Sequence, residues 1–426
     1  TVFFFMLPLV RDGHLATVLC MIALSPWFTP FGSVIDRFKK KGYLMGLGAL
    51  YLLMLLGLLY SEDKEFGWHF LYRQYMQLLV PLVCILYADF LKVHWRRYLW
   101  TWLLFACFGA ALVLLFNVLP DEIVQPLIDI LHMRTRVNSN FWEFGMYVPF
   151  MNKVQFSHLV ALSTLIGLWL WISNYRRIST GIMVLALFVF SFPLGGRGAT
   201  LALLGGISVL CYGYLFRRFY PLIKESLGKW YAKLITVVAP IVLLVVLMVV
   251  SIEVPAVAKR YGKIAKEFEI YYSGEVYNQP DHITAHQTTI SRIVAYEHFW
   301  KAIQENGFWF GVGTGDLRNV SNAYYDQDNL MVRNHFHSQY LTIWLAIGLV
   351  GLVLFFACWF IVIFMIFKSN RKKAWMLWSL VLFYALSFIP DAMLKLQTAS
   401  TLFGLSFCFL ACMSLPENSL SKEGKS

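Results

Sequence analysis

Long apolar segments recur along most of the 426-residue chain. Many of them are close to the ~20 residues that an α-helix needs to cross a bilayer core. The pattern predicts about twelve spans, with boundaries near 1–10, 14–31, 43–60, 69–90, 98–118, 151–174, 178–194, 199–216, 234–252, 336–367, 374–389 and 396–413. We therefore expect an all-α polytopic membrane protein.

The hydrophilic segments divide the chain into four parts. Residues 1–252 hold nine expected spans and a short hydrophilic segment at 119–150, and a large loop follows at 253–335. Three more spans occupy 336–415, and 416–426 form a polar tail. Within the large loop, apolar residues recur at helical spacing over 291–305, which predicts an amphipathic helix. The loop between the ninth and tenth spans is therefore expected to be partly helical.

Composition agrees with a chain that is solvated mainly by lipid. Hydrophobic residues make up 59% of the sequence and charged residues 14%, whereas a soluble domain is about half apolar and about a quarter charged. The net charge of +12 does not point to nucleic acid, because Lys and Arg lie in short clusters between apolar segments. These clusters occur at 37–41, 92–97, 176–177, 217–218, 224–233 and 368–373.

The clusters alternate with segments that are poorer in Lys and Arg, which sets an orientation. Clusters in short loops face the cytoplasm. With the spans above, both termini are then cytoplasmic, and 119–150 and 253–335 lie on the opposite side of the membrane. All seven cysteines fall in or beside apolar segments, so a disulfide framework in the large loop is excluded.

Arg197 lies between two expected spans, in a short glycine-rich segment at 191–200. The segment is too short to be a domain and places the guanidinium at or slightly within the membrane boundary. An arginine at that depth needs an anionic partner, and the planar guanidinium suits a phosphate or diphosphate. The alternative is an arginine that anchors the chain at the interface.

Arg292 falls in the first turn of the helix predicted at 291–305. A cation is unfavourable there, because the helix dipole attracts negative charge to its N-terminus. A bound anion beside this turn would offset that cost. A solvated surface arginine is the alternative.

The third candidate segment combines a glycine run with two histidines. The run 311–315 follows no βαβ pattern and lacks a Lys-Ser/Thr ending, which favours a turn over a nucleotide loop. His335 and His337 precede a long apolar helix, where a neutral imidazole can accept a proton from a hydroxyl. The alternatives are histidines that face water, or a metal site with His282 and His286; without a nearby carboxylate cluster we expect no metal.

These three segments together resemble the O-antigen ligase and polymerase superfamily over roughly residues 150–390. The resemblance rests on Gly-Gly-Arg-Gly-Ala around Arg197, on Arg292 and Trp300 ahead of the glycine turn, on His337-Ser-Gln-Tyr-Leu341 and on Gly348-Leu-Val-Gly351. Two positions depart from the usual family pattern. Gly196 stands where Ser is usual before the arginine, and Ser338 stands where Asn is usual after the histidine.

The resemblance implies a glycosyltransferase of the bacterial inner membrane whose donor is a glycan linked to undecaprenyl diphosphate. The acceptor hydroxyl belongs to lipid A-core in a ligase, to another repeat unit in a polymerase or to a protein in an oligosaccharyltransferase. It further implies that Arg197 and Arg292 hold the diphosphate and that His337 activates the acceptor hydroxyl on the periplasmic face. His335 and Tyr340 are further candidates for substrate binding, and no metal or other cofactor is expected.

A flippase or transporter for lipid-linked oligosaccharide is the competing interpretation. It predicts several ionisable residues in the middle of spans, and His158 is the clearest candidate of that kind. For the enzyme, displacement at the anomeric carbon in one step would invert its configuration. The sequence leaves the sugar, the acceptor and the oligomeric state open.

Overall fold

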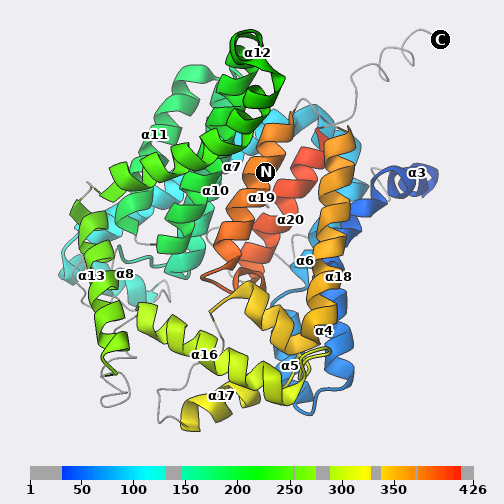
Figure 1. Cartoon of the computed structure of the whole chain (residues 1–426), viewed down its shortest axis with the longest axis vertical. Helices are drawn as coiled ribbons and strands as arrows, with labels where there is room; N and C mark the ends of the chain where they lie inside the picture. Colours follow the sequence, from blue (N-terminus) through cyan, green and yellow to red (C-terminus); the bar gives the residue numbers. More distant parts are fainter. Residues whose placement is uncertain are drawn as a thin grey trace.

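The computed structural model describes residues 31–130, 146–194, 196–252, 255–274, 288–327, 337–369 and 373–413. Every regular element in these ranges is a helix (Figure 1). The elements are α3 (Phe31–Lys41), η1 (Gly42–Gly48), α4 (Ala49–Leu59), α5 (Lys64–Tyr72), α6 (Met76–Leu86), α7 (Ala88–Val118), α8 (Asp121–Ile130), α10 (Lys153–Ile172), α11 (Arg177–Leu194), α12 (Arg197–Ile252), α13 (Pro255–Tyr272), α16 (Thr288–Asn306), α17 (Leu317–Gln327), α18 (Gln339–Ser369), α19 (Ala374–Phe388), η3 (Met393–Lys395) and α20 (Gln397–Cys412).

Five helices in the described ranges are long and apolar enough to cross a membrane, which makes the chain a multi-pass membrane protein. They are Ser33–Leu59, Ala88–Val118, Lys153–Ile172, Arg177–Leu194 and Gln339–Lys368. Shorter apolar helices occupy Gly198–Tyr214, Ala374–Phe388 and Gln397–Cys412. The all-helical membrane architecture is confirmed, while the number of twelve spans stays a prediction. The expected spans 1–10 and 14–31 lie outside the described residues.

Two expected boundaries differ from the structure. The predicted span 69–90 is divided by a turn into α5 and α6. At the start of α6, the buried Gln77 donates a hydrogen bond to the carbonyl of Leu394, 3.0 Å away. The predicted spans 199–216 and 234–252 both belong to α12, a single helix of 56 residues. The Lys and Arg residues between them end an apolar segment but not a helix, because both residue types have high helix propensity.

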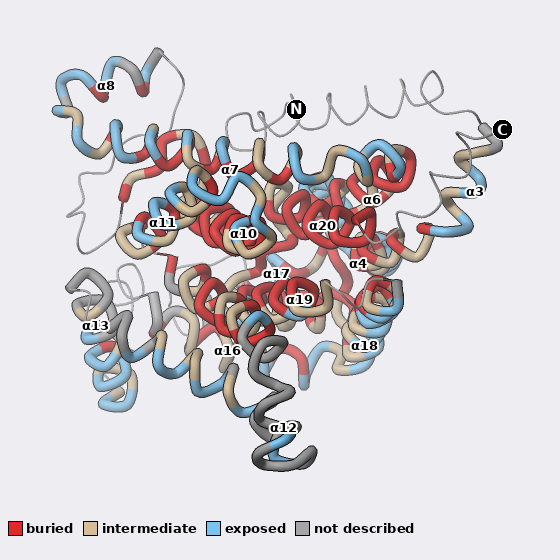
Figure 2. The backbone as a smooth tube through the Cα atoms, turned by 90° about the horizontal axis from the view of Figure 1, so that it is seen from above, coloured by how far each residue is buried: buried red, intermediate tan, exposed pale blue. Residues whose placement is uncertain are grey.

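The core is built around α10, which is buried along most of its length between α7, α11 and α12 (Figure 2). Beside it, α19 and α20 are also largely buried. Aromatic rings fill the space between α18, α19 and α20, with neighbouring centroids 5.0–6.2 Å apart; they belong to Trp359, Tyr384, Phe388, Phe403 and Phe407.

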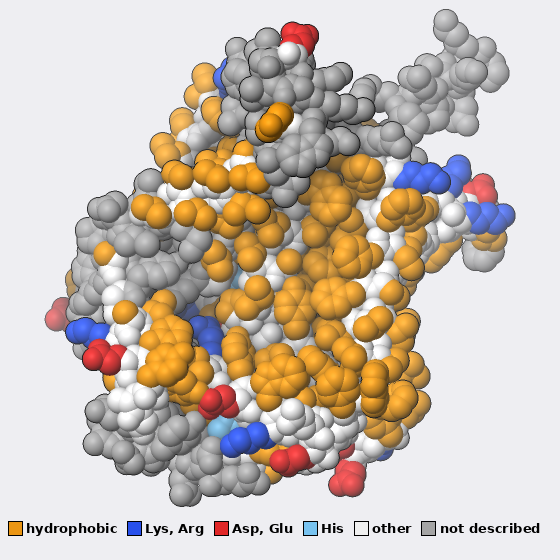
Figure 3. Space-filling model, viewed as in Figure 1, with side chains coloured by type: hydrophobic (Ala, Val, Ile, Leu, Met, Phe, Trp, Pro, Cys, Tyr) orange, Lys and Arg blue, Asp and Glu red, His pale blue; other side chains and the backbone are white. Residues whose placement is uncertain are grey.

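Apolar side chains also cover much of the outer surface. On α11 the exposed residues Ile178, Ile182, Leu185 and Val189 recur at spacings of four and three, which places them on one face of the helix. Figure 3 shows an apolar face over α18 and α19, with charged side chains gathered near α3 at one end and near α16 and α17 at the other. An apolar band between two charged ends is the surface that a bilayer requires.

A glycine-containing turn at 307–316 is inserted against a break in α18. At Gly348 the helix has φ 70° and ψ −177°, a conformation that is essentially restricted to glycine. The freed backbone groups bond to the turn in the pairs Val312 N–H to Leu345 O, Gly313 N–H to Ala346 O, Leu349 N–H to Phe308 O and Val350 N–H to Trp309 O, at 2.8–3.2 Å. The glycine run is therefore a structural turn, as predicted, and it fixes the C-terminal end of α16 on the membrane helices.

Candidate functional site

The segment 389–395 between α19 and α20 is the point at which the candidate segments meet. From α16, the hydroxyl of Tyr296 donates to the carbonyl of Ile389 at 3.1 Å. One turn earlier on the same helix, Nη2 of Arg292 lies 3.4 Å from Oδ1 of Asp391. Both side chains of this ion pair are largely buried, at 25% and 15% exposed. The N-terminal half of α16 is thus held on this segment by one neutral and one charged hydrogen bond.

The start of α18 reaches the same segment from another side. The hydroxyl of Ser338 donates to the carbonyl of Phe388 at 3.3 Å, and the backbone N–H of Leu394 donates to Oε1 of Gln339 at 2.7 Å. Both residues are buried. Because His337 directly precedes them, the structure brings this histidine to the side of the site that is formed by the end of α19.

The start of α12 completes the arrangement through the two glycines beside Arg197. A Cβ atom on Gly196 would lie 2.5 Å from Oγ of Ser157 on α10. A Cβ on Gly198 would lie 2.7 Å from Cγ of Pro390 and 3.1 Å from Oδ2 of Asp391. Both positions need glycine because α12 begins in direct contact with α10 and with the 389–395 segment.

The site has an excess of positive charge. Burial raises the pKa of Asp391, and the neighbouring Arg292 guanidinium opposes this by favouring the carboxylate. Burial also lowers the pKa of Lys395 to about 8, with Asp391 opposing and the like charge of Arg73 adding to the decrease. Two basic side chains, Arg292 and Lys395, therefore act on one carboxylate, and Arg73 adds positive charge beside Lys395, an arrangement that favours a bound anion.

The sequence-predicted residues are placed as follows. Arg292 contacts the 389–395 segment directly through Asp391, whereas His337 is placed near it by Ser338 and Gln339, and it adopts φ 50° two residues before α18 begins. Arg197 is the first residue of α12, but its side chain is outside the described part, as is the whole of His335. Tyr340 donates its hydroxyl to the carbonyl of Ala385 at 3.0 Å, so this group is already bonded within the helix bundle. The functional roles of these residues stay predictions.

Asp391 is the residue that the sequence reasoning missed. It lies in a short connection that was recognised only as poor in basic clusters. The available signal was a lone acidic residue after Pro390 between two apolar segments, because an acid at that depth needs a cationic partner. The sequence offered no means of choosing Arg292, which is 99 residues away, as that partner.

A comparison with family models covers α12, α16 and the start of α18 in this arrangement. The model described as O-antigen ligase matches residues 182–356. This match supports the O-antigen ligase superfamily for this part of the chain. The O-antigen ligase domain thus includes Arg197, Arg292 and His337, while Asp391 lies beyond its matched end. No curated protein matches the chain.

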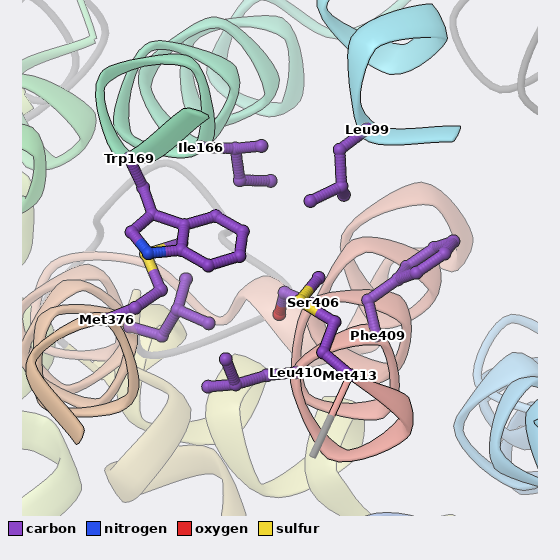
Figure 4. Close-up of a pocket in the computed structure, with 9 residues that line it drawn as sticks. Leu99, Ile166, Trp169, Met376, Ser406, Phe409, Leu410 and Met413 are labelled. Carbon is purple, nitrogen blue, oxygen red and sulfur yellow. The ribbon is translucent and has the colours of Figure 1, made fainter. Parts of the chain in front are cut away.

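The described part of the chain also holds an apolar pocket of about 380 Å³, lined by Tyr51, Trp68, Leu71, Tyr72, Tyr75, Leu78 and Leu79. No three His, Cys, Asp or Glu side chains among the described residues are grouped so that they could hold a metal ion. A small space between α7, α10, α19 and α20 is shown in Figure 4. It measures about 10 Å³, room for one water, and its polar Ser406 bonds within its own helix to Phe403 O at 2.9 Å. We interpret it as a packing space.

Proposed function

We propose that this protein is an O-antigen ligase-like glycosyltransferase that moves a glycan from undecaprenyl diphosphate to a hydroxyl of lipid A-core oligosaccharide. The observation that carries the proposal is the Arg292–Asp391 ion pair, which lies against the start of α12. Arg292 is inside the O-antigen ligase domain, and Asp391 lies beyond its matched end. Arginine on one helix and the arginine-bearing N-terminus of another converge on a site with positive excess. Such a site suits the diphosphate of a lipid-linked donor.

The diphosphate end of the donor defines the first half of the mechanism. Negative charge develops on the leaving diphosphate as the bond between sugar and phosphate breaks. Fixed cations stabilise that charge more in the transition state than in the ground state. We assign this role to Arg292 and Arg197. Asp391 holds the Arg292 guanidinium in place before the donor binds and limits its motion, which is a positioning role.

The acceptor end is assigned to His337. Its neutral imidazole would take the proton from the attacking hydroxyl, a contribution of about 10²–10⁴-fold. Attack on the anomeric carbon from the face opposite to the diphosphate inverts the configuration. A product that retains the donor configuration would refute this single-displacement step.

The site also suggests an orientation in the inner membrane. The basic residues of α3 lie at the end of the molecule opposite to α16 and α17 (Figures 1 and 3). By the positive-inside rule, the α3 end faces the cytoplasm and the site faces the periplasm. The proposed division of the chain follows: membrane helices in 1–252, a periplasmic domain in 253–335, membrane helices in 336–415 and a cytoplasmic tail in 416–426.

A deletion strain complemented with single variants tests the proposal. Replacement of Arg197, Arg292 or His337 by Ala should abolish ligated surface polysaccharide while the protein still reaches the membrane. Normal polysaccharide in all three strains would end the assignment. The lipopolysaccharide of the deletion strain separates the related functions. Core without O-chain, together with accumulated lipid-linked polymer, indicates a ligase; core capped by a single repeat indicates a polymerase. Normal lipopolysaccharide with loss of a glycosylated protein indicates an oligosaccharyltransferase.

A further inference from the structure

A buried histidine on α10 interacts electrostatically with Asp391. His158 is on α10 and is 1% exposed. Its Nδ1 lies 2.8 Å from the carbonyl of Val154. Because a carbonyl only accepts, Nδ1 must carry a proton. Phe383 of α19 meets the imidazole edge-on, with centroids 6.3 Å apart. The ring is therefore held by its own helix and by the helix that leads to Asp391.

The other ring nitrogen of His158 is the unusual feature. Nε2 is buried and has no hydrogen-bond partner within the described ranges. A buried polar atom left without a partner costs about 1–3 kcal/mol, so it calls for an explanation. The carboxylate of Asp391 is the group whose charge acts on His158. The preceding residue, Ser157, lies against Gly196, so this turn of α10 packs directly against the start of α12.

The charge balance changes when a diphosphate binds. In the structure, Arg292 is the ion-pair partner of Asp391. A diphosphate that binds competes for the same guanidinium. The buried carboxylate of Asp391 is then left with less positive charge beside it, which is unfavourable. The other titratable groups whose charge acts on Asp391 are Lys395 on the same segment, Tyr296 on α16 and His158. The side chain of Arg197 lies outside the described part.

We propose that His158 is a positioning residue that shares one proton with Asp391 when a diphosphate engages Arg292. With Nδ1–H bonded to Val154, Nε2 and the carboxylate both present lone pairs, so a hydrogen bond between them needs one added proton. Solvent supplies that proton, and no covalent bond changes. The shared proton replaces part of the compensation that Arg292 provided and keeps the 389–395 segment in place. This inference rests on the proposed function, since it assumes a diphosphate ligand.

The test measures proton uptake on binding of farnesyl diphosphate, a soluble probe of the same chemical class. The full-length protein in detergent micelles is titrated calorimetrically in two buffers of different ionisation enthalpy above neutral pH. For the wild type we expect His158 and Asp391 to take up about one proton per ligand, in addition to any taken up by Lys395, and an affinity that falls at least about tenfold per pH unit where this proton is bound. In His158→Gln, the amide N–H can donate to Asp391 without an added proton. Uptake should then be smaller than in the wild type by about one proton per ligand, leaving only the contribution of Lys395, and the affinity should depend less steeply on pH.

Control variants separate the possible outcomes. His158→Asn retains a donor near the Nδ1 position but nothing at Nε2; it should also lose this part of the uptake and bind about tenfold more weakly. The thermal unfolding midpoint checks that each variant is folded, and Asn supplies the readout if Gln does not fold. Unchanged uptake in a folded His158 variant overturns this inference while leaving the proposed function intact. Failure of the wild type to bind the probe, or equal binding by Arg292→Gln, removes the proposed function and this inference with it.

Discussion

The contact between the start of α12 and the 389–395 segment makes Gly198 a sensitive position. In Gly198→Ala the new methyl group would lie 2.7 Å from Cγ of Pro390. Non-bonded carbon atoms are most stable at about 3.5–4.0 Å. Relief of the clash therefore requires α12 and this segment to separate by roughly 1 Å, and both are packed at their other sides. The expected cost in folding free energy is about 1–3 kcal/mol.

The expected effect on transfer is larger than the effect on stability. A misplacement of about 1 Å in a catalytic site can lower the rate by ~10²-fold. The clash in Gly198→Ala would move Arg197 relative to Arg292, because Asp391 holds the latter. We therefore expect ligated polysaccharide to decrease by about two orders of magnitude, while the amount of protein in the membrane decreases much less.

Gly205→Ala provides the matched control on the same helix. Its methyl group would lie 2.5 Å from Cδ1 of Leu386, the flexible end of a side chain on α19. This variant crowds the same pair of helices two turns away from the site and should retain transfer. Transfer per membrane-inserted protein is measured for both variants in the deletion strain. Equal losses in the two variants, or full transfer in Gly198→Ala, would refute the reasoning about the site.

Three further predictions follow from the described contacts. Asp391→Asn should weaken diphosphate-dependent transfer at least about tenfold, because the Arg292 guanidinium loses its charged partner; an unchanged rate would contradict the positioning role. Gly348→Ala should destabilise the protein by roughly 3 kcal/mol or more, since φ is +70° and the turn lies against it, whereas Gly262→Ala, with open space around it in the interior of α13, should unfold at or slightly above the wild-type temperature because Ala favours the helix. Burial lowers the pKa of Lys395 from 10.5 to about 8, so the folded protein binds fewer protons than the unfolded chain between these values. Its stability relative to Lys395→Met should then rise with pH in that window, by up to about 3 kcal/mol; a constant difference in denaturation midpoint would show that the ammonium is not buried.

Much of the fold could be predicted because the hydrophobic pattern reports directly on membrane helices. The helix at 291–305 was predicted from its spacing and is present as α16, Thr288–Asn306. The hydrophobic pattern gave the wrong helix boundaries where one helix contains two apolar segments. Charged residues end an apolar segment without ending the helix, so 199–252 is continuous. The break at Gly348 was also not predicted, because its cause is the turn at 307–316 and not the local sequence.

The sequence identified only those site residues whose position is energetically unfavourable on its own. Arg197 and Arg292 stood out because each is a cation in an unfavourable place. The proposed roles of Asp391 and of the Nε2 atom of His158 depend on contacts between α10, α12, α16 and the 389–395 segment. Such contacts depend on packing between elements that are separated in the sequence, as the Arg292–Asp391 pair illustrates with a separation of 99 residues. No local pattern records them.

Glycan transfer by the purified protein tests the central claim most directly. The wild type and Arg292→Ala are placed in separate lipid vesicles with the host's own undecaprenyl-diphosphate-linked glycan and lipid A-core. The appearance of ligated product is followed together with the release of undecaprenyl diphosphate. We expect both to appear in equal amounts with the wild type and both to be lost with Arg292→Ala. Equal product from the two proteins, or movement of the glycan lipid across the vesicle membrane without any product, would contradict the claim.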